Sequence, residues 1–277
     1  ATYFSVAASF FTPVELVAVV GDDFTERDMS IFDGRRINTE GLQRVRGAKT
    51  FFWSGEYGYD LNVAKTRDTQ LNVFADFKPR LSERQQNTDV LFLANIDPEL
   101  QMDVLRQTKR PRVVALDTMN YWITAKRDAL QRIFAAVDLI IINEAEVRQF
   151  MDESNLVKAA RAILSLGARA LVIKRGEYGV LMITRESAFA APAYPLENVF
   201  DPTGAGDTFA GGFLGYLASR KEVTDREIRR AIIFGSVLAS YTVEKFSLDR
   251  LREIGIDDIQ QRYQAFRELT HFEDFEV

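Results

Sequence analysis

The chain has 277 residues, of which 47% are hydrophobic and 27% are charged, and its net charge is −5. This length suits one large α/β domain with an appendage or two small domains, and the composition excludes disordered, collagen-like and membrane architectures. Acidic and basic residues are interspersed, so we expect no nucleic-acid partner and no membrane-surface segment.

Cysteine and histidine chemistry is almost entirely excluded. The chain has no cysteine, and its one histidine, His271, lies in an acidic C-terminal segment. Disulfides, thiolate nucleophiles and cysteine metal sites are therefore ruled out, and a reducing, cytoplasmic location is expected. We interpret His271 as a solvated terminal residue, which leaves no histidine for Ser-His-Asp catalysis or for a zinc site.

The first twenty residues are apolar, but they lack the basic leader of a signal peptide, and polar residues interrupt them. We expect a helix, a break at Thr12-Pro13, a strand over 16–20, and then a turn at Gly21-Asp22-Asp23. A chain that starts in mid-helix at Ala1 suggests a missing upstream segment.

The region 31–80 has a different character, with many aromatic residues, glycines and threonines. The alternation of Leu71, Val73, Ala75 and Phe77 has a period of two, which predicts a strand. We predict a small antiparallel sheet over 31–80, inserted into an α/β core formed by 1–30 and 81–277. This sheet could be a surface meander, a lid over a site, or a clasp in a homodimer.

From Asp89 onward, short apolar strands alternate with amphipathic helices. Strands are expected over 90–94, 113–116, 139–142 and 170–173, with 180–183 as a hairpin partner for the last. Helices are expected after Pro98 and over 127–136, 144–151 and 156–166. This alternation is typical of a mostly parallel sheet that helices cover on both faces.

Polar residues follow each of these strands. They are Asn95, Asp97, Asp117, Asn120, Asn143, Glu146, Lys174 and Arg175. Ligands of open α/β sheets bind outside the carboxyl ends of the strands, so these side chains are expected to converge there. Each one alone could equally be a helix cap or a turn residue.

Two glycine-bearing loops are candidate anion sites. The stretch from Lys174 to Gly179 offers a cation and a flexible backbone for phosphate oxygens, although it could equally be a hairpin turn. The stretch from Asp201 to Asp207 runs into a helix whose apolar stripe is Phe209, Phe213 and Leu217. Unpaired N–H groups at a helix N-terminus favour a bound anion.

The expected helix also contains Gly211, Gly212 and Gly215. Each interior glycine costs a helix about 1 kcal/mol relative to alanine, a cost usually offset by close approach of another backbone or of a ligand.

Asp207 is unusual in this setting, because a carboxylate would repel an anion. It is therefore a helix cap, a metal partner or a proton acceptor. Neither loop has the Walker or the dinucleotide-binding pattern. An anion loop with an adjacent carboxylate and a nearby cation fits phosphoryl transfer to an alcohol best.

The stretch Asp201-Pro202-Thr203-Gly204-Ala205-Gly206-Asp207-Thr208-Phe209 closely resembles the C-terminal signature of the ribokinase-like (PfkB) carbohydrate kinases. Asn143-Glu144-Ala145-Glu146 resembles their Asn-x-x-Glu motif, and the likeness covers essentially the whole chain. It implies a ribokinase-like three-layer α/β/α sandwich with a mostly parallel central sheet and a small β-sheet lid.

The resemblance also implies an ATP-dependent kinase that phosphorylates a hydroxyl of a sugar or sugar-like small molecule. A nucleoside kinase of the same fold is an alternative, favoured by the aromatic lid residues Phe51, Phe52, Trp53 and Tyr57. A catalytically silent sugar or nucleotide sensor is another, although the intact Asp207 argues against it.

By the same resemblance, Asp207 is the catalytic base, and the backbone of Gly204, Ala205, Gly206 and Asp207 forms the anion hole. Mg²⁺ is ordered, through water, by Asn143 and Glu146. The other ATP-binding residues are expected to be Lys174, Gly176, Gly179 and Thr203, and the candidate substrate residues are Tyr3, Asn95, Asp117 and Asn120.

Three departures from the family pattern affect these expectations. The N-terminal strand and Gly-Gly turn of the family are absent before Ala1, and Tyr3 stands where sugar-specific members often carry Asn, which weakens a ribose or fructose assignment. The segment 244–248 replaces a later Gly-rich loop, which makes activation by a monovalent cation doubtful.

Overall fold

The computed structural model describes residues 1–62, 64–271 and 273. These residues form two compact units. The first contains Ala1, Pro13–Arg175 and Met182–Ala188, and the second contains Thr2–Thr12, Gly176–Leu181 and Phe189–Val277.

A six-stranded sheet is the largest sheet among the described residues, with the strand order β10-β9-β8-β7-β6-β5. Its strands are β5 (Val90–Leu93), β6 (Val113–Leu116), β7 (Leu139–Asn143), β8 (Ala170–Lys174), β9 (Val180–Thr184) and β10 (Ala188–Ala191). The strands from β5 to β8 are parallel to their neighbours. The mostly parallel sheet is thus confirmed, and β9 is the neighbour of β8, as expected.

The apolar composition of these strands explains their position. Every residue of β6 is buried, as are the first four residues of β7 and of β8, because strands covered on both faces need apolar side chains throughout. Parallel pairing brings the carboxyl ends together, and Asn143 lies opposite Lys174. The sheet therefore places the strand-end residues of its neighbouring strands along one edge.

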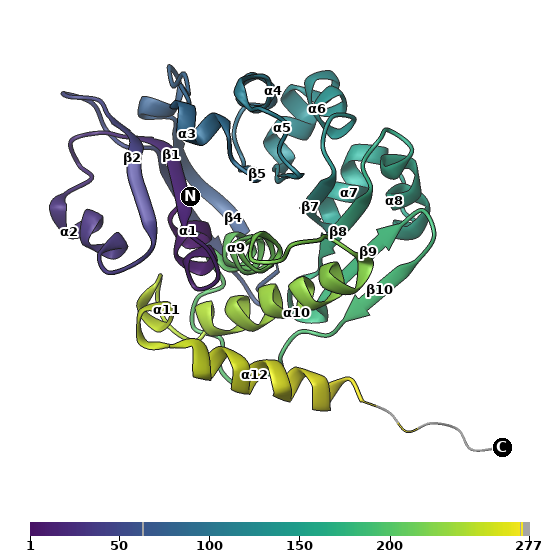
Figure 1. Cartoon of the computed structure of the whole chain (residues 1–277). Helices are drawn as coiled ribbons and strands as arrows, with labels where there is room; N and C mark the ends of the chain where they lie inside the picture. The colour runs from purple at the N-terminus through teal and green to yellow at the C-terminus, as the bar shows by residue number, and fades with distance from the viewer. Residues whose placement is uncertain (63, 272, 274–277) are drawn as a thin grey trace. The chain divides into compact units, whose positions relative to one another are not determined.

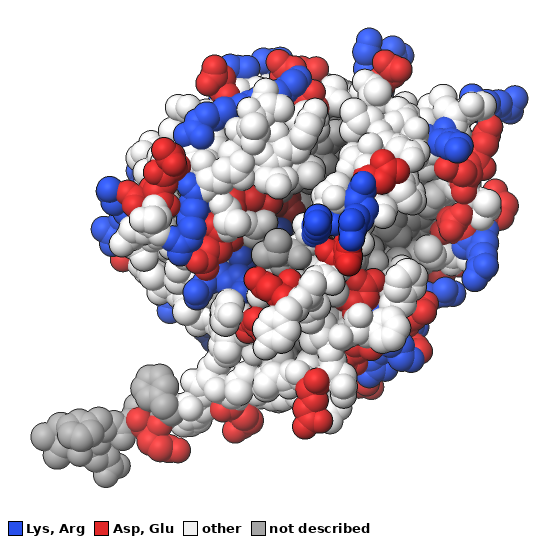
Figure 2. All heavy atoms as spheres, turned by 180° about the vertical axis from the view of Figure 1, so that it is seen from behind, with Lys and Arg blue, Asp and Glu red and all other residues white. Residues whose placement is uncertain are grey.

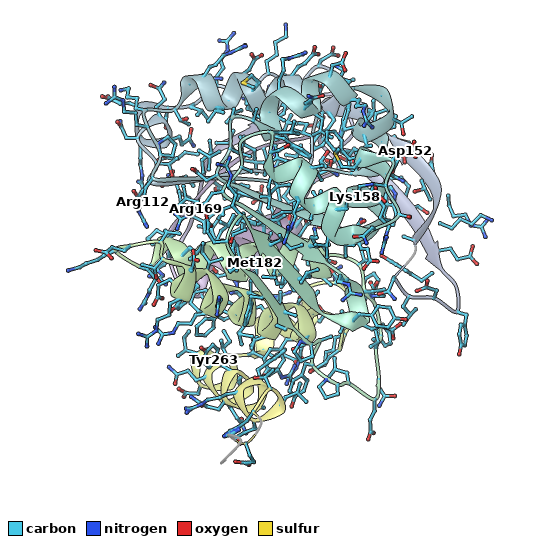
Figure 3. All side chains as sticks on the ribbon, turned by 90° about the vertical axis from the view of Figure 1, so that its right-hand side faces the viewer. Arg112, Asp152, Lys158, Arg169, Met182 and Tyr263 are labelled. Atoms are coloured by element: carbon cyan, nitrogen blue, oxygen red, sulfur yellow. The ribbon has the colours of Figure 1, made fainter. Side chains whose placement is uncertain are left out.

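Helices connect the parallel strands (Figure 1). They are α4 (Pro98–Gln107), α5 (Asn120–Ala125), α6 (Arg127–Phe134), α7 (Glu144–Met151) and α8 (Leu156–Leu164). Figure 3 shows Lys158 on α8, and it shows Arg112 and Arg169, which directly precede β6 and β8. These two arginines mark the amino ends of the strands, opposite the edge that carries the candidate site.

The region before β5 contains two separate strand pairs. The strand β1 (Val14–Val20) pairs in parallel with β2 (Ile37–Arg44), and β3 (Phe52–Tyr57) pairs antiparallel with β4 (Ala64–Gln70). The predicted small antiparallel sheet is confirmed for β3 and β4, whereas β2 belongs with β1. Short helical segments also occur here, namely α2 (Glu26–Met29), η1 (Ser30–Phe32) and α3 (Glu83–Gln86).

The predicted strand over residues 71–77 is wrong. A 3₁₀ turn, η2 (Asn72–Phe74), lies there instead. Val73 and Phe77 pack against Val19, whereas Leu71 is 43% exposed, so the apolar residues do not share one strand face. The division into a core of 1–30 and 81–277 with a lid over 31–80, and the role of that lid, stay predictions.

The second unit is mainly helical (Figure 1). It contains α1 (Thr2–Ser9), η3 (Gly176–Tyr178), α9 (Ala205–Ala218), α10 (Asp225–Thr242), α11 (Asp249–Glu253) and α12 (Ile256–Leu269). The helix, break and strand predicted at the start of the chain correspond to α1, the Thr12-Pro13 break and β1, and are confirmed.

Close backbone packing explains the glycines of α9. A Cβ added at Gly211 would lie 2.4 Å from the Phe4 carbonyl oxygen, and one at Gly215 would lie 2.7 Å from Ala8 Cα, both on α1. A Cβ at Gly212 would lie 3.0 Å from the carbonyl oxygen of Phe234 on α10. The expectation that another backbone approaches these glycines is confirmed.

The face seen in Figure 2 shows acidic and basic side chains intermixed rather than gathered into a field of one sign. Within the described part of the chain, no helix has the length and apolar character that crossing a membrane requires.

Candidate active site

Three ionisable side chains meet at the carboxyl edge of the parallel strands. We call Asp117, Glu146 and Lys174 the strand-end cluster. The Lys174 ammonium lies 3.2 Å from the Asp117 carboxylate, and the two side chains are only 18% and 8% exposed. Asp117 follows β6, Lys174 ends β8, and Glu146 lies in the first turn of α7, directly after β7. Two of the residues expected at the strand ends are thus joined by a direct ion pair.

Asn143 and Glu146 form a reciprocal cap at the start of α7. The Asn143 side chain accepts a hydrogen bond from the Glu146 N–H, and the Glu146 carboxylate accepts one from the Asn143 N–H, both at 2.8 Å. A capping box of this kind satisfies N–H groups that a helix start leaves unpaired. The Asn-x-x-Glu spacing therefore has a structural use as well as the metal role implied by the resemblance.

Burial raises the pKa of Glu146 to about 7, and the nearby Asp117 carboxylate adds to the rise. Lys174 and the hydrogen bonds from Asn143 oppose it by favouring the charged form. The adjacent Glu144 behaves in the opposite way. Hydrogen bonds from Arg148, the larger effect, and from Arg175 hold the pKa of Glu144 below its usual value. The first turn of α7 thus carries one carboxylate that resists ionisation and one that favours it.

The remaining strand-end residues have local roles. Asn95 is exposed, and its side-chain oxygen accepts a hydrogen bond of 3.1 Å from Trp122 Nε1. Asp97 caps α4 and pairs with Lys126 at 2.7 Å. Asn120 is the exposed first residue of α5. The expected convergence is therefore realised for Asp117, Glu146 and Lys174.

Gln101 is a residue of this edge that the sequence analysis missed. Its side chain is 1% exposed, and its amide nitrogen lies within 3.1 Å of the carbonyl oxygens of Leu93, Ala94 and Asp117. It therefore ties the ends of β5 and β6 together. A glutamine on the buried face of an amphipathic helix was the available signal, but the sequence does not show which carbonyl groups it reaches.

The second unit contains the glycine loop, which we define as residues Asp201–Asp207. Gly204 is the N-cap of α9 with a φ of 80° and a ψ of −2°, the left-handed conformation that glycine adopts most easily. Asp201 accepts a hydrogen bond of 2.9 Å from the Thr203 N–H, which shapes the start of the loop. The predicted sequence of a tight loop and a helix is confirmed, and Asp207 lies in the first turn of that helix.

Tyr3 packs directly on this loop. A Cβ at Gly204 would lie 2.5 Å from the Tyr3 ring, so the ring and the backbone are in close contact. Among the N–H groups expected to form the anion hole, that of Ala205 donates to the Pro202 carbonyl oxygen at 3.2 Å. The candidate hole therefore depends on the N–H groups of Gly204, Gly206 and Asp207, and it stays a prediction.

The other glycine-bearing loop follows β8. Gly176 and Gly179 have φ values of 55° and 85°, and Gly176–Tyr178 form the 3₁₀ turn η3. A Cβ at Gly179 would lie 2.1 Å from the Ala191 carbonyl oxygen, so only glycine fits there. The turn interpretation is correct, and nucleotide binding by this loop stays a prediction.

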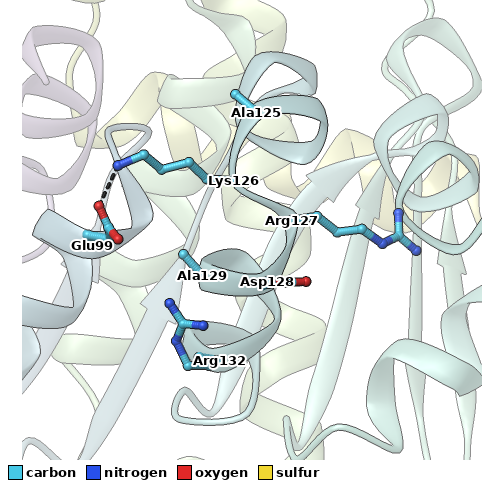
Figure 4. Close-up of a pocket in the computed structure, with 7 residues that line it drawn as sticks. All are labelled: Glu99, Ala125, Lys126, Arg127, Asp128, Ala129 and Arg132. Atoms are coloured by element: carbon cyan, nitrogen blue, oxygen red, sulfur yellow. Dashed lines mark hydrogen bonds and ion pairs between the residues drawn. The ribbon is translucent and has the colours of Figure 1, made fainter.

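A shallow hollow of about 400 Å³ lies elsewhere in the first unit, beside the start of α6 (Figure 4). Its lining residues are Glu99, Ala125, Lys126, Arg127, Asp128, Ala129 and Arg132. Lys126 pairs with Asp97 and Glu99, and Arg127 lies over the Phe150 ring at 4.9 Å. The hollow contains none of the expected site residues.

No group of three or more histidine, aspartate or glutamate side chains is arranged to hold a metal ion within the described residues.

A family model described as pfkB family carbohydrate kinase matches residues 4–253. A cytidine kinase of Thermococcus kodakarensis is 36% identical over 213 residues, which are 75% of this chain and 75% of that protein. The match covers most of both chains, so the sequence likeness is not confined to the glycine loop.

Solved structures show the same fold. The nucleoside kinase of Methanocaldococcus jannaschii aligns with a TM-score of 0.76 at 20% identity, over 96% of this chain and 85% of its own. An Arabidopsis thaliana ribokinase complexed with ribose and ATP aligns with a TM-score of 0.76 at 16% identity, over 95% of this chain and 86% of its own. These likenesses confirm the predicted ribokinase-like fold class.

Proposed function

This chain belongs to the pfkB family of carbohydrate kinases, and we propose that it transfers the γ-phosphoryl group of ATP to a hydroxyl of a nucleoside or of a sugar. Members of this family are phosphotransferases with an alcohol group as acceptor. The observation that carries the proposal is the position of Asp207, which follows the glycine loop in the first turn of α9.

In the proposed reaction, the Asp207 carboxylate accepts the proton of the acceptor hydroxyl as that oxygen bonds to the γ-phosphorus. The bond from the γ-phosphorus to the β–γ bridging oxygen breaks, and ADP leaves. The N–H groups at the start of α9 stabilise the negative charge on the phosphoryl oxygens, and the positive end of the helix dipole adds to this effect. Phosphoryl transfer needs positioning and charge stabilisation more than a covalent nucleophile, so a chain without cysteine and with one peripheral histidine can perform it.

The residues on the strand edge fit a nucleotide with Mg²⁺. Asn143 and Glu146 supply the oxygen ligands that Mg²⁺ prefers, and we propose that they act through water. When bound, the ion would neutralise charge that develops on the phosphates. Lys174, held beside Asp117, supplies a cation suited to phosphate oxygens. We further propose that Gly176, Gly179 and Thr203 contact the nucleotide.

The acceptor of the phosphoryl group could be a nucleoside or a sugar. The sequence alone favoured a sugar, but the likeness to a cytidine kinase over 75% of this chain supports a nucleoside as the first candidate. Of the aromatic residues expected to stack on a base, Phe51 already stacks on Phe74 at 4.8 Å, whereas Phe52 is 48% exposed. A sugar remains the second candidate, supported by the fold shared with a ribokinase complexed with ribose.

The test is phosphoryl transfer from ATP with Mg²⁺ to a panel of nucleosides and sugars, by the wild type and by Asp207→Asn. General base catalysis contributes about 10²–10⁴-fold, so the variant should lose at least about 100-fold in turnover with each accepted substrate. Calorimetry should show ATP binding close to that of the wild type. Near-normal turnover by Asp207→Asn would refute the base assignment, and the absence of any accepted acceptor would refute the proposed activity.

A further inference from the structure

The end of α10 supports the glycine loop through its backbone. The Val243 carbonyl oxygen, directly after α10, accepts hydrogen bonds from the N–H groups of Phe200 at 2.7 Å and Asp201 at 3.4 Å. These bonds fix the point where the chain enters the loop. The loop therefore depends on a helix that begins 24 residues after Asp201, at Asp225.

A side-chain bond connects the same helix end to the other end of the loop. The hydroxyl of Thr242, the last residue of α10, lies 3.0 Å from the hydroxyl of Thr208 in the first turn of α9. Thr208 is 0% exposed and Thr242 is 1% exposed, so water does not reach either side chain. Thr208 directly follows Asp207, the proposed base. The last turn of α10 thus holds both sides of the glycine loop.

The pattern of bonds makes this contact specific. Thr242 Oγ1 also lies 3.2 Å from the Leu238 carbonyl oxygen, one turn earlier on α10. A hydroxyl has one proton, so Thr242 shares it between the Thr208 hydroxyl and this carbonyl oxygen, and the contact with Thr208 is the shorter of the two. Removal of the Thr242 hydroxyl therefore leaves the buried Thr208 hydroxyl without this donor.

The helix end that carries Thr242 is itself held in place. Arg262 on α12 donates a hydrogen bond of 3.1 Å to Ser240, pairs with Glu244 at 2.6 Å, and lies 3.4 Å from the centre of the Tyr241 ring. Because the end of α10 is held by α12, its contact with the glycine loop can fix the position of the loop. A helix end that frays could not do this.

We propose that Thr242 is a positioning residue for Asp207, acting through Thr208 on the first turn of α9. This inference rests on the proposed role of Asp207 as the base. The Thr242–Thr208 bond sets the rotation of that turn, and with it the direction of the carboxylate toward the acceptor hydroxyl. Loss of the bond should impair the chemical step more than the binding of ATP.

Three variants of the full chain test this inference. Thr242→Val removes the hydroxyl at nearly constant volume, and Thr242→Ser restores it. Ser236→Ala is the control, because Ser236 is a buried residue of the same helix whose hydroxyl has no hydrogen-bond partner among the described residues, so its loss removes no bond to the loop or to α12. The measurements are kcat and KM for phosphoryl transfer, and the amide hydrogen exchange of residues 200–208 in ligand-free protein.

Thr242→Val should lower kcat about tenfold with the KM for ATP changed by less than about twofold, because small misplacements of reacting groups cost up to about 100-fold in rate. Its loop amides should exchange faster than those of Ser236→Ala, and Thr242→Ser should recover most of the rate. Equal effects of Thr242→Val and Ser236→Ala would overturn the inference, as would a Thr242→Ser variant as slow as Thr242→Val. If the wild type transfers no phosphate, the proposed function fails, and the exchange comparison still tests whether Thr242 holds the loop.

Discussion

The two glutamates at the start of α7 should respond to pH in opposite directions. The pKa of Glu146 is raised to about 7 by burial, from a usual value of 4.5, so the folded state holds its proton more tightly than the unfolded state does. The stability that Glu146 contributes is therefore fully present below pH 4.5 and is lost as the pH rises through about 7. At about 1.4 kcal/mol per pH unit, the loss is about 3 kcal/mol.

The experiment compares the free energy of unfolding of the wild type and of Glu146→Gln by urea denaturation between pH 4 and pH 8. Glutamine can keep the capping bond to the Asn143 N–H, so the variant removes the titration while retaining the helix cap. The stability of the wild type relative to the variant should fall by about 3 kcal/mol across this range. Parallel curves for the two proteins would refute the reasoning that burial dominates at Glu146.

Glu144→Gln is the control for this prediction. The pKa of Glu144 is lowered by hydrogen bonds from Arg148 and Arg175, so its contribution to stability is present above its usual pKa and is lost as the pH falls. The difference between wild type and Glu144→Gln should therefore change in the opposite direction, and at lower pH. A general effect of acid on the fold would change both differences in the same direction.

Two further predictions concern the glycine loop and the strand-end cluster. Gly204→Ala should lower the unfolding temperature and abolish most activity. The φ of 80° at Gly204 disfavours a side chain, and the added Cβ would lie 2.5 Å from the Tyr3 ring. Gly34→Ala is its control, with a φ of 69° and nothing within 4 Å, and equal losses of stability in the two variants would exclude a clash with Tyr3. Lys174→Met should raise the pKa of Glu146 further, because it removes the cation that favours the charged form of that carboxyl group. Carboxyl titration by NMR measures this change, and an unchanged titration would show that Lys174 does not act on the cluster.

The parallel strands could be predicted because each of them is a short apolar run bounded by polar residues. The helix predicted over 144–151 matches α7 at both ends. Its start is encoded locally by Asn143 and Glu146, whose spacing is that of a capping box. Local signals of this kind do not depend on how the rest of the chain folds, so the sequence alone reveals them.

The contacts that the sequence did not reveal join residues far apart in the chain. Lys174 and Asp117, whose convergence was expected but whose direct ion pair was not, are 57 residues apart, and Thr242 and Thr208 are 34 apart. The strand predicted over 71–77 failed for a related reason. Val73 and Phe77 pack on Val19 of a distant strand, so tertiary packing rather than local periodicity decides their conformation. No pattern within a window of ten residues contains this information.

The Asn-x-x-Glu motif shows why such distant contacts matter for assigning function. Its spacing is fully explained by the cap of α7, so the motif alone does not establish a metal role. What distinguishes Glu146 from an ordinary capping residue is its position in the strand-end cluster, where Asp117 and Lys174 both influence its charge. A variant that deletes the side chain would disturb cap and charge together. Glu146→Gln separates them, so a loss of Mg²⁺-dependent activity in that variant at pH 8, where the wild-type side chain is ionised and with the fold intact, would identify the charge as the functional property.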